Sequence, residues 1–247
     1  MKDNSTQTSA LEQRITSQKK QTFNLNAWIF ENLDIQGNEE VLELCCGTGA
    51  QTNIFSQKLL YGSIVSVDIN NESIEKTKKS IKNNQVSFIN AGIDDTELYL
   101  KKTYDLIFSA YGFYYSINPE ILHEKLINSL KSDGRFVIVG PILGNNKQLY
   151  SIIKDLGCEI PVNVMDDSEY FMMRFFEIFL KNYKNVKIIR RFNNINYDSC
   201  GKLLEYWKNT TFYTPGFDDK FINSSKKYFQ GNDIVISKSI AYLEGSL

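Results

Sequence analysis

The sequence is poor in histidine and cysteine, two of the residue types that most often bind metals. Its 247 residues include one histidine, His123, and four cysteines. No two cysteines form a Cys-x-x-Cys pair, which argues against a zinc site, so we predict no bound metal. So few unpaired cysteines are typical of a reducing compartment, and we expect a cytoplasmic protein. The cysteines are Cys45, Cys46, Cys158 and Cys200.

Long apolar runs and an excess of one charge are also missing. Residues 1–20 are polar without an apolar segment, which does not match a signal peptide, and no run reaches membrane-spanning length. The 28 basic and 29 acidic residues are interleaved and give a formal net charge of -1. This balance provides no basic surface for a nucleic acid. We therefore expect a small-molecule ligand, no nucleic acid and no membrane span, in a monomer or homodimer.

The first 140 residues alternate between β-rich runs and segments with helical spacing of apolar residues. A helix is expected from Asn118, because asparagine followed by proline is typical of a helix start, and Gly134 is expected to end it. Strands that alternate with helices predict βαβ units and a parallel sheet. The expected strands are 41–45, 63–67, 86–90, 105–109 and 135–139, and the other expected helices are 22–33, 50–60 and 72–83.

The pattern changes after Pro141. Helices are expected at 146–156 and around residues 203–207, strands at 186–192 and 234–243, and a strongly aromatic segment covers 167–183. No glycine- or proline-rich linker separates these segments from the first part. We therefore predict a single domain over 1–247, in which about 160–183 forms an embedded cap and 1–21 is flexible or covers a ligand.

Acidic and small residues collect where the first three strands end. Glu43 lies inside the apolar run 41–45, which is unusual because an ionised side chain is rarely buried without a partner. The small-residue turn 45–49 follows it, Asp68 follows the second strand, and 91–95 follows the third. Open α/β sheets bind ligands at such carboxyl ends. These segments are the predicted binding site.

A dinucleotide-binding oxidoreductase is the first alternative for this site. Its fingerprint, Gly-x-Gly-x-x-Gly, matches poorly, because Thr52 stands where the third glycine belongs. A strand that presents an acid also suits a cationic or neutral ligand better than a pyrophosphate.

The segment 41–49, VLELCCGTG, resembles motif I of the class I S-adenosylmethionine-dependent methyltransferases. The resemblance continues through Val67-Asp68, through 104–110 (YDLIFSA) and through 126–140 (LINSLKSDGRFVIVG), and covers about residues 38–141. It implies an α/β fold with a seven-stranded doubly wound sheet of order 3-2-1-4-5-7-6, whose last strand is antiparallel, and with an embedded helical cap.

The resemblance also implies S-adenosylmethionine as the cofactor. In the family, the acid of motif I orders the turn or meets the amino group, and the acid after the second strand holds the ribose hydroxyls. The third loop faces adenine, and the residues ending the fourth strand lie beside the methionine chain. The residues implied are Glu43, Cys45, Gly47, Gly49, Asp68, Ile69, Ile93, Asp94, Ser109 and Ala110.

The sequence departs from the family pattern at two places. Cys45 stands where the first glycine is usual, which its small size makes tolerable. In the third loop the usual acid is missing after Ala91-Gly92, and either Asp94 or Asp95 replaces it.

Catalytic residues are less clearly marked. Many relatives place histidines after the fourth strand, where this chain has Tyr114 and Tyr115. These tyrosines either position the acceptor or the cofactor, or only form a wall of the pocket. His123 is expected to be a surface or structural residue.

Acceptor-binding residues are expected after the fourth strand and in the aromatic segment. The alternative for the aromatic segment is a purely structural core. Before the first core helix, Arg14, Ser17 and Gln18 either touch the cofactor carboxylate or belong to a mobile terminus. The candidates are Tyr111, Tyr170, Met173, Arg174 and Phe175, and more weakly Thr211, Phe212 and Tyr213.

The expected function is methyl transfer from S-adenosylmethionine to a small molecule, with oxygen favoured over nitrogen as the acceptor atom. The donor is already activated, so the protein mainly has to position the acceptor. A non-catalytic partner that binds the cofactor is the alternative from another class.

Overall fold

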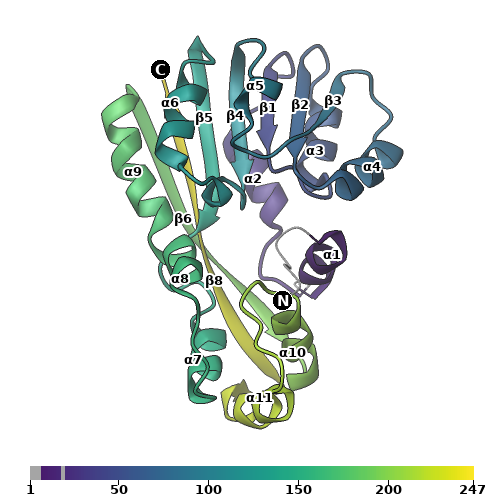
Figure 1. The fold of residues 1–247 in the computed structure, drawn as a ribbon, viewed down its shortest axis with the longest axis vertical. Coiled ribbons are helices and arrows are strands. Elements are labelled where there is room, and N and C mark those ends of the chain that lie inside the picture. The colour runs from purple at the N-terminus through teal and green to yellow at the C-terminus, as the bar shows by residue number, and fades with distance from the viewer. Residues whose placement is uncertain (1–6, 18–19) are drawn as a thin grey trace. The chain divides into compact units, whose positions relative to one another are not determined.

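The computed structural model describes residues 7–17 and 20–247. Its strands form one sheet in the order β3-β2-β1-β4-β5-β8-β6, and the short β7 pairs with β8 (Figure 1). The predicted α/β class and strand order are therefore confirmed, with β8 as the expected seventh strand. The strands are β1 (Glu40–Leu44), β2 (Ser63–Asp68), β3 (Val86–Asn90), β4 (Tyr104–Ala110), β5 (Leu130–Pro141), β6 (Asn185–Tyr197), β7 (Phe229–Gln230) and β8 (Asp233–Ser246).

The strands β1 to β5 are parallel, as the alternation of strands with helices predicts. Val41 and Leu42 of β1 are fully buried, and so are Leu106 and Ile107 opposite them in β4. This register brings the carboxyl ends of β1, β2, β3 and β4 to one edge of the sheet. The residues that follow these strands lie along that edge.

The helices follow the expected alternation. Asn70 and Asn118 cap α4 and α6, since their side chains accept backbone N–H groups of Ser73 and Ile121. The helices are α1 (Thr8–Ser17), α2 (Leu25–Leu33), α3 (Ala50–Lys58), α4 (Asn71–Ser80), α5 (Thr96–Tyr99), α6 (Pro119–Ile127), α7 (Lys147–Asp155), α8 (Val162–Glu169), α9 (Phe171–Asn182), α10 (Cys200–Lys208) and α11 (Asp218–Ser225), with short 3-10 turns η1 (Phe113–Tyr115) and η2 (Lys226–Tyr228).

Strand β8 is antiparallel to β5. Leu247 N donates to Gly134 O, whereas Ile142 N donates to Ser239 O. Residue numbers therefore increase along β5 while they decrease along β8, as in an antiparallel pair. This confirms the antiparallel last strand. The prediction that Gly134 ends a helix is wrong, because α6 ends at Ile127 and β5 begins at Leu130. Gly134 lies within β5, where a Cβ atom would come within 2.9 Å of the Lys131 carbonyl oxygen.

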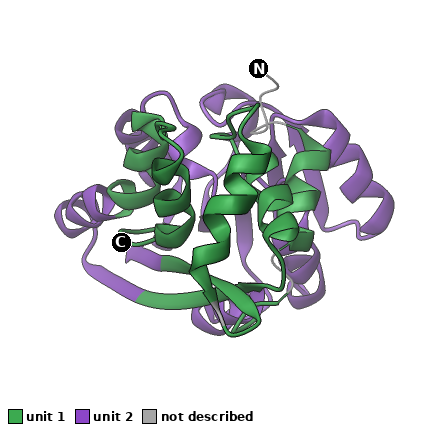
Figure 2. Ribbon diagram, turned by 90° about the horizontal axis from the view of Figure 1, so that it is seen from below, with its two compact units in different colours: residues 1–24, 141–172, 190–240 green, residues 25–140, 173–189, 241–247 purple. Residues whose placement is uncertain are grey.

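The chain forms two compact units, which are described separately (Figure 2). Unit 2 comprises 25–140, 173–189 and 241–247, and carries β1 to β4 with their helices. Unit 1 comprises residues up to 24, 141–172 and 190–240. The segment expected as a cap is divided between them, with α8 in unit 1 and most of α9 in unit 2. The single domain with an embedded cap stays a prediction.

Unit 1 has its own apolar core between α7, α10, α11 and the strand residues of this unit. Trp207 of α10 is fully buried and stacks on Phe221 of α11, with 4.6 Å between ring centroids. Ile234 and Ile236 of β8 complete this core. An aromatic packing of this size supplies much of the apolar burial that a small unit needs.

The segment from Lys20 to Phe23 lies along β6 within unit 1. Asn193 is buried, and its Oδ1 accepts the backbone N–H and the hydroxyl of Thr22 at 3.1 and 3.0 Å. Gln21 forms an antiparallel bridge with Ile195. These bonds hold Gln21 and Thr22 to β6.

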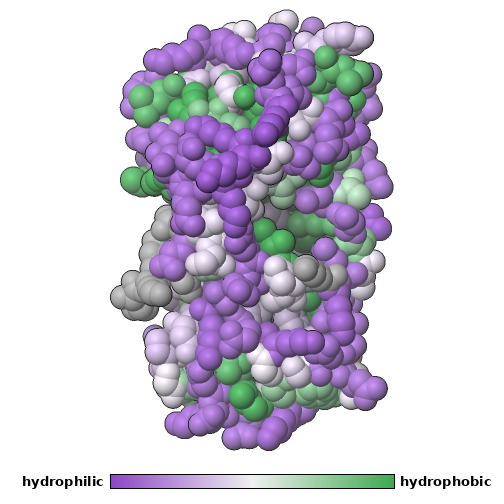
Figure 3. Space-filling view, turned by 90° about the vertical axis from the view of Figure 1, so that its right-hand side faces the viewer, coloured by the Kyte–Doolittle hydropathy of each residue, from purple (hydrophilic) through white to green (hydrophobic). Residues whose placement is uncertain are grey.

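The surface agrees with the balanced composition. The face in Figure 3 is largely hydrophilic, with separate apolar spots. In residues 7–17 and 20–247, no helix combines the length and apolar character needed to cross a membrane.

Candidate functional site

The turn after β1 has a backbone that only small residues adopt easily. The φ angles of Cys45, Gly47 and Gly49 are 58°, 54° and 75°, all in the left-handed region. Gly49 N closes the turn by donating to Cys46 O at 3.0 Å, and Cys46 N joins the turn to β2 by donating to Val67 O at 3.0 Å. A Cβ atom on Gly49 would lie 2.1 Å from Thr77 Cγ2 of α4. The two glycines of the motif are thus required by conformation and, at Gly49, by close packing.

Cys45 adopts a left-handed conformation that favours glycine, and Gly112, after β4, leaves space for its side chain. A Cβ atom on Gly112, after β4, would lie 2.3 Å from Cys45 Cβ and 2.9 Å from its Sγ. Burial, with Asp68 and Asp94 nearby, raises the pKa of the Cys45 thiol. The thiol therefore stays protonated and serves as a packing group rather than a nucleophile.

Glu43 is buried beneath this turn, at the start of α3. Its Oε2 accepts the hydroxyl of Thr52 at 2.6 Å and the hydroxyl of Ser66 at 2.8 Å. Ser66 is its direct neighbour across the β1–β2 ladder. Burial raises the pKa of Glu43 to about 7, against the lowering effect of the bonds from Thr52 and Ser66. Glu43 thus links β1, β2 and α3 under the turn.

Asp68 joins the ends of β1 and β2. Its Oδ2 accepts Gly47 N–H at 2.7 Å, and its Oδ1 accepts Asn70 N–H at 2.8 Å. The carboxylate is half-buried, and the next side chain, Ile69, is 63% exposed. A carboxylate fixed by two backbone amides still has lone pairs for further donors.

The third loop presents two acids that have different partners. Asp95 Oδ2 accepts Gly92 N–H at 2.8 Å and closes its own turn. Asp94 reaches the next segment, where its Oδ1 accepts the Ser116 hydroxyl at 2.5 Å and its Oδ2 accepts Ile117 N–H at 2.9 Å. Asp94 also lines a pocket of about 190 Å³ to which Asp95 does not contribute. Ile93, between the strand and these acids, is buried.

The end of β4 completes the edge. Ser109 is fully buried and donates its hydroxyl to Leu44 O at 3.2 Å, which ties β4 to β1, and Ala110 follows it half-buried. Tyr111 has a φ of 57° and donates its N–H to Val139 O at 2.8 Å. Tyr114 and Tyr115 lie in η1 with ring centroids 4.8 Å apart, and Tyr115 is 47% exposed.

The expected acceptor residues have different surroundings. Phe175 is fully buried against Phe113, with 5.2 Å between centroids. Arg174 Nε lies 3.6 Å from Glu120 Oε1, and Met173 is 40% exposed. Tyr170 is exposed and belongs to unit 1, unlike the other three. Phe175 therefore has the surroundings of a core residue, and the acceptor roles stay predictions.

His123 is a structural residue, as expected. It is buried, its Nε2 lies 3.0 Å from Tyr183 Oη, and its ring stacks on Phe179. Burial lowers the pKa of His123 to about 4, so the ring is neutral at physiological pH. A catalytic base is not expected from it.

The remaining candidates belong to unit 1. Arg14 of α1 donates to Asn209 O at 2.7 Å, and Ser17 donates to Arg14 O at 2.8 Å. Gln18 lies outside the described residues. The weaker candidates are engaged locally, since Phe212 O accepts Trp207 Nε1–H and Tyr213 Oη donates to Asp218.

Sequence reasoning missed three residues of the site. Thr52 and Ser66 complete the bonds of Glu43, and Gly112 makes room for Cys45. A signal for Ser66 was present, because it is a polar residue inside the apolar run 63–67. For Thr52 the sequence showed only that it stands where a dinucleotide fingerprint has its third glycine. In the described part of the chain, no cluster of three or more histidine, cysteine or acidic side chains could hold a metal.

Comparison with known proteins places this geometry in a family. Residues 35–192 match the family model described as a methyltransferase domain. A curated relative, the malonyl-[acyl-carrier protein] O-methyltransferase of Priestia megaterium, is 32% identical over 116 residues, which is 46% of this chain and 42% of that protein. The matched stretch thus spans less than half of the curated relatives.

Solved structures show the same fold over most of the chain. The YcgJ protein of Bacillus subtilis superposes with a TM-score of 0.63 at 16% identity, covering 90% of this chain and 97% of that one. The plantazolicin methyltransferase BpumL in complex with SAH gives 0.51 at 15% identity, covering 97% and 86%. Because the family model matches more than half of this chain, the chain belongs to the methyltransferase-domain family.

Proposed function

We propose that this protein transfers a methyl group from S-adenosylmethionine to a small organic acceptor, with an oxygen as the favoured acceptor atom. The observation that carries the proposal is the Asp68 carboxylate, which is fixed by Gly47 N–H and Asn70 N–H beside the small-residue turn. A carboxylate at this position is suited to accept the two ribose hydroxyls of a nucleoside. The family membership gives the reaction class.

The surroundings of Glu43 favour S-adenosylmethionine over a dinucleotide. A pyrophosphate binds at a helix N-terminus because the amides there are free to donate to it. Here the start of α3 already has the carboxyl group of Glu43, which accepts the Thr52 hydroxyl and also its backbone N–H. An acid at this place repels an anion and suits the positively charged sulfonium and amino groups of S-adenosylmethionine.

The residues of the edge have separable roles in this proposal. S-adenosylmethionine supplies a methyl group that is already activated for in-line transfer. Glu43, Cys45, Gly47 and Gly49 shape the turn against its methionine part, and Ser109 and Ala110 lie on the neighbouring strand end. Asp68 holds the ribose. The adenine contacts fall to Ile69, Ile93 and Asp94, because Asp94 lines a pocket and Asp95 does not.

Tyr114 and Tyr115 are proposed to position the acceptor or the cofactor. Their rings lie against each other, and the greater exposure of Tyr115 leaves its face open to a ligand. A general base is needed only if the acceptor keeps its proton until late in the transfer. The names of the curated relatives, O-methyltransferases, support an oxygen acceptor. We place the protein in the cytoplasm, where free cysteines persist.

Calorimetry with S-adenosylmethionine, S-adenosylhomocysteine and NAD tests the proposal directly. We expect both sulfur ligands to bind and NAD not to bind. Asp68→Ala should abolish or strongly weaken this binding. The matched control is Asp133→Ala, which removes an exposed acid of β5 outside the candidate site and should leave the binding unchanged. Absence of binding by either sulfur ligand would refute the methyltransferase function.

A second measurement separates an enzyme from a non-catalytic partner. Release of S-adenosylhomocysteine over a panel of small alcohols, phenols, carboxylic acids and amines reports turnover and the acceptor atom together. Turnover only with amines would replace the oxygen acceptor by nitrogen. Cofactor binding without turnover on any acceptor would support the binding partner instead.

A further inference from the structure

A lysine interrupts the apolar face of β8 in unit 1. Ile234, Ile236 and Ile240 are buried and share one face of the strand with Lys238, because side chains two residues apart point the same way. Lys238 is only 8% exposed. Burying an ammonium group costs free energy unless it is paired, so a lysine at this position needs a reason.

The protein partners of Lys238 are both neutral. Its Nζ donates to Tyr206 Oη of α10 at 2.6 Å and to the Oδ1 of Asn146, which precedes α7. No carboxylate of the described residues forms an ion pair with it. An ammonium has three donors, so these bonds leave one donor unused. The Nζ also lies 4.6 Å from the centroid of the Tyr206 ring, so the positive charge is met by neutral groups alone. Within residues 7–17 and 20–247, this cation thus has neutral partners and no anionic one.

A neighbouring hydroxyl extends this polar cluster. The ring of Tyr197 lies 5.8 Å from the ring of Tyr206. Tyr197 Oη is a buried oxygen that forms no hydrogen bond of normal geometry with the described residues, and the Ser17 side chain lies near it. Burial and the neighbouring Tyr206 raise the pKa of Tyr197, so its hydroxyl keeps its proton and can donate. We name Lys238, Tyr206, Asn146 and Tyr197 the Lys238 cluster.

We propose that the Lys238 cluster is a binding site of unit 1 for the carboxylate of a small organic acid with an apolar body. One ammonium with neutral neighbours balances one negative charge, which favours a carboxylate monoanion over a phosphate dianion. The isoleucines beside Lys238 and the aromatic residues of the unit 1 core favour an apolar remainder.

Binding of simple probes tests the proposal without any turnover. Hexanoate is titrated into the protein by calorimetry, with hexanamide as its neutral counterpart and inorganic phosphate as the competing anion. We expect saturable binding of hexanoate and about tenfold or greater loss of its affinity in Lys238→Met, the effect of one charge-assisted hydrogen bond. Hexanamide and phosphate should bind at least about tenfold more weakly than hexanoate.

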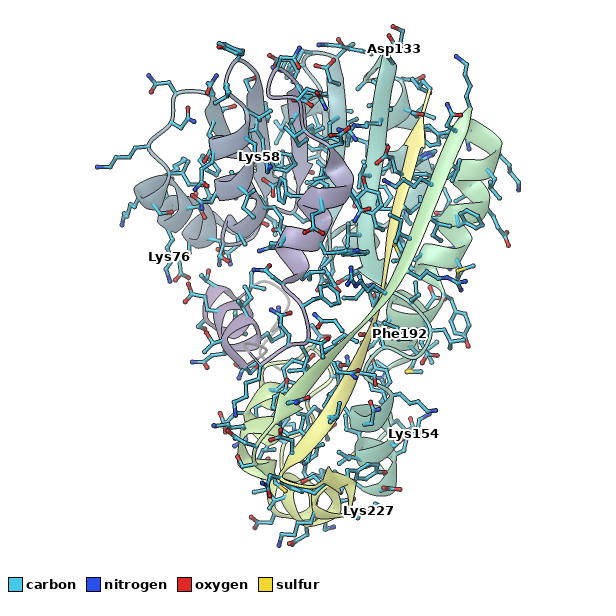
Figure 4. The ribbon with its side chains drawn as sticks, turned by 180° about the vertical axis from the view of Figure 1, so that it is seen from behind. Lys58, Lys76, Asp133, Lys154, Phe192 and Lys227 are labelled. Carbon is cyan, nitrogen blue, oxygen red and sulfur yellow. The ribbon has the colours of Figure 1, made fainter. Side chains whose placement is uncertain are left out.

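A matched variant controls for the loss of a positive charge. Lys154 lies exposed on α7 of the same unit (Figure 4). Lys154→Met should bind hexanoate as the wild type does. Equal binding by Lys238→Met and the wild type, no binding of hexanoate to the wild type, or preference for phosphate would each overturn the proposal.

The affinity for S-adenosylmethionine separates this inference from the proposed function. That ligand has a carboxylate of its own, so Lys238 has to be tested against it. We expect Lys238→Met to bind S-adenosylmethionine with unchanged affinity. A matching loss for that ligand would refute a separate carboxylate site in unit 1, while leaving the methyltransferase function in place. Failure of the wild type to bind S-adenosylmethionine would instead refute the proposed function.

Discussion

Unit 2 and unit 1 each bury an ionisable side chain, and they hold it in different ways. Glu43 in unit 2 is bonded by Ser66, its neighbour across the strand ladder, and by Thr52 in the helix that follows its own turn. Lys238 in unit 1 is bonded by Asn146 and Tyr206, which come from segments far from it in sequence. The partners of Glu43 are thus set by the sheet itself, whereas those of Lys238 depend on tertiary packing.

The comparison distinguishes a carboxyl group that supports the fold from an ammonium group that is proposed to bind a ligand. Every bond of Glu43 supports the turn that we assign to the cofactor, so removal of the acid should affect both folding and binding. Lys238 carries a charge without an anionic partner into an apolar core, which lowers stability unless an anionic ligand binds it. Removal of the lysine also removes its two hydrogen bonds, so stability should change little and the main effect should be on binding.

The largest expected effect is that of Glu43→Ala. The change leaves the Thr52 and Ser66 hydroxyls buried without their acceptor, and we expect a loss of about 2–4 kcal/mol in unfolding free energy. Lys238→Met should change it by less than about 1 kcal/mol, because the lost hydrogen bonds are offset by the lost cost of burying a charge. Urea unfolding measures both. S-adenosylmethionine affinity should fall in Glu43→Ala and fall less in Glu43→Gln, which keeps an acceptor oxygen but loses the negative charge. Equal stability losses at Glu43 and Lys238 would break the comparison.

The pH dependence of stability sharpens the comparison within unit 2. Glu43 has a folded-state pKa of about 7, above its ordinary 4.5. Its contribution to the free energy of unfolding is therefore fully present below pH 4.5 and is lost as the pH rises to 7. His123 has a pKa of about 4, below its ordinary 6.5, so its contribution is present above pH 6.5 and is lost as pH falls to 4. Each amounts to about 3 kcal/mol across its window.

These two slopes oppose each other between pH 4.5 and 6.5, and the wild type should change little there. Glu43→Gln should lose stability as the medium is acidified, and His123→Phe should gain it. Urea unfolding at pH 4.5, 5.5 and 6.5 measures the slopes. Parallel curves for the wild type and Glu43→Gln would mean that Glu43 does not titrate in this range.

The strands of unit 2 and its site were predictable because their signals are local. The apolar runs 41–45 and 86–90 match β1 and β3 closely, and the small-residue turn between β1 and α3 lies where its residue types require. The acid inside β1 was also visible. Its bonds were not, because Thr52 and Ser66 meet it only when the strands pair in register.

Unit 1 was harder to predict for the same reason. Lys238 follows Ile234 and Ile236 in alternation and is seen from the sequence only as a polar residue in the middle of a strand. Its burial depends on Tyr206 and Asn146, which no spacing rule connects to it. The helix α1 and the segment that Asn193 fastens to β6 were likewise not predicted, because their stability comes from contacts with distant residues.

Gly112 and Cys45 provide a smaller test of how tightly the turn is packed. We expect Gly112→Ala to lose about 1–3 kcal/mol, because its new methyl group would overlap the Cys45 side chain. Cys45→Gly removes that side chain and suits the φ of 58°, so the double variant should regain most of the loss. Thermal unfolding of the wild type, the two single variants and the double variant measures these changes in stability. If the two single changes add up to that of the double variant, the two residues do not contact each other.

The smallest expected effect separates the two duties of Asp68. Asp68→Asn keeps one oxygen that can accept Gly47 N–H or Asn70 N–H, so unfolding free energy should fall by about 1 kcal/mol. The affinity for S-adenosylmethionine should fall about tenfold, because a neutral amide holds ribose hydroxyls less strongly than a carboxylate. Lys238→Met, measured beside it, should leave that affinity unchanged. Unaltered cofactor affinity in Asp68→Asn would limit Asp68 to ordering the turn, and unit 2 would then hold both of its acids, Glu43 and Asp68, for structure alone.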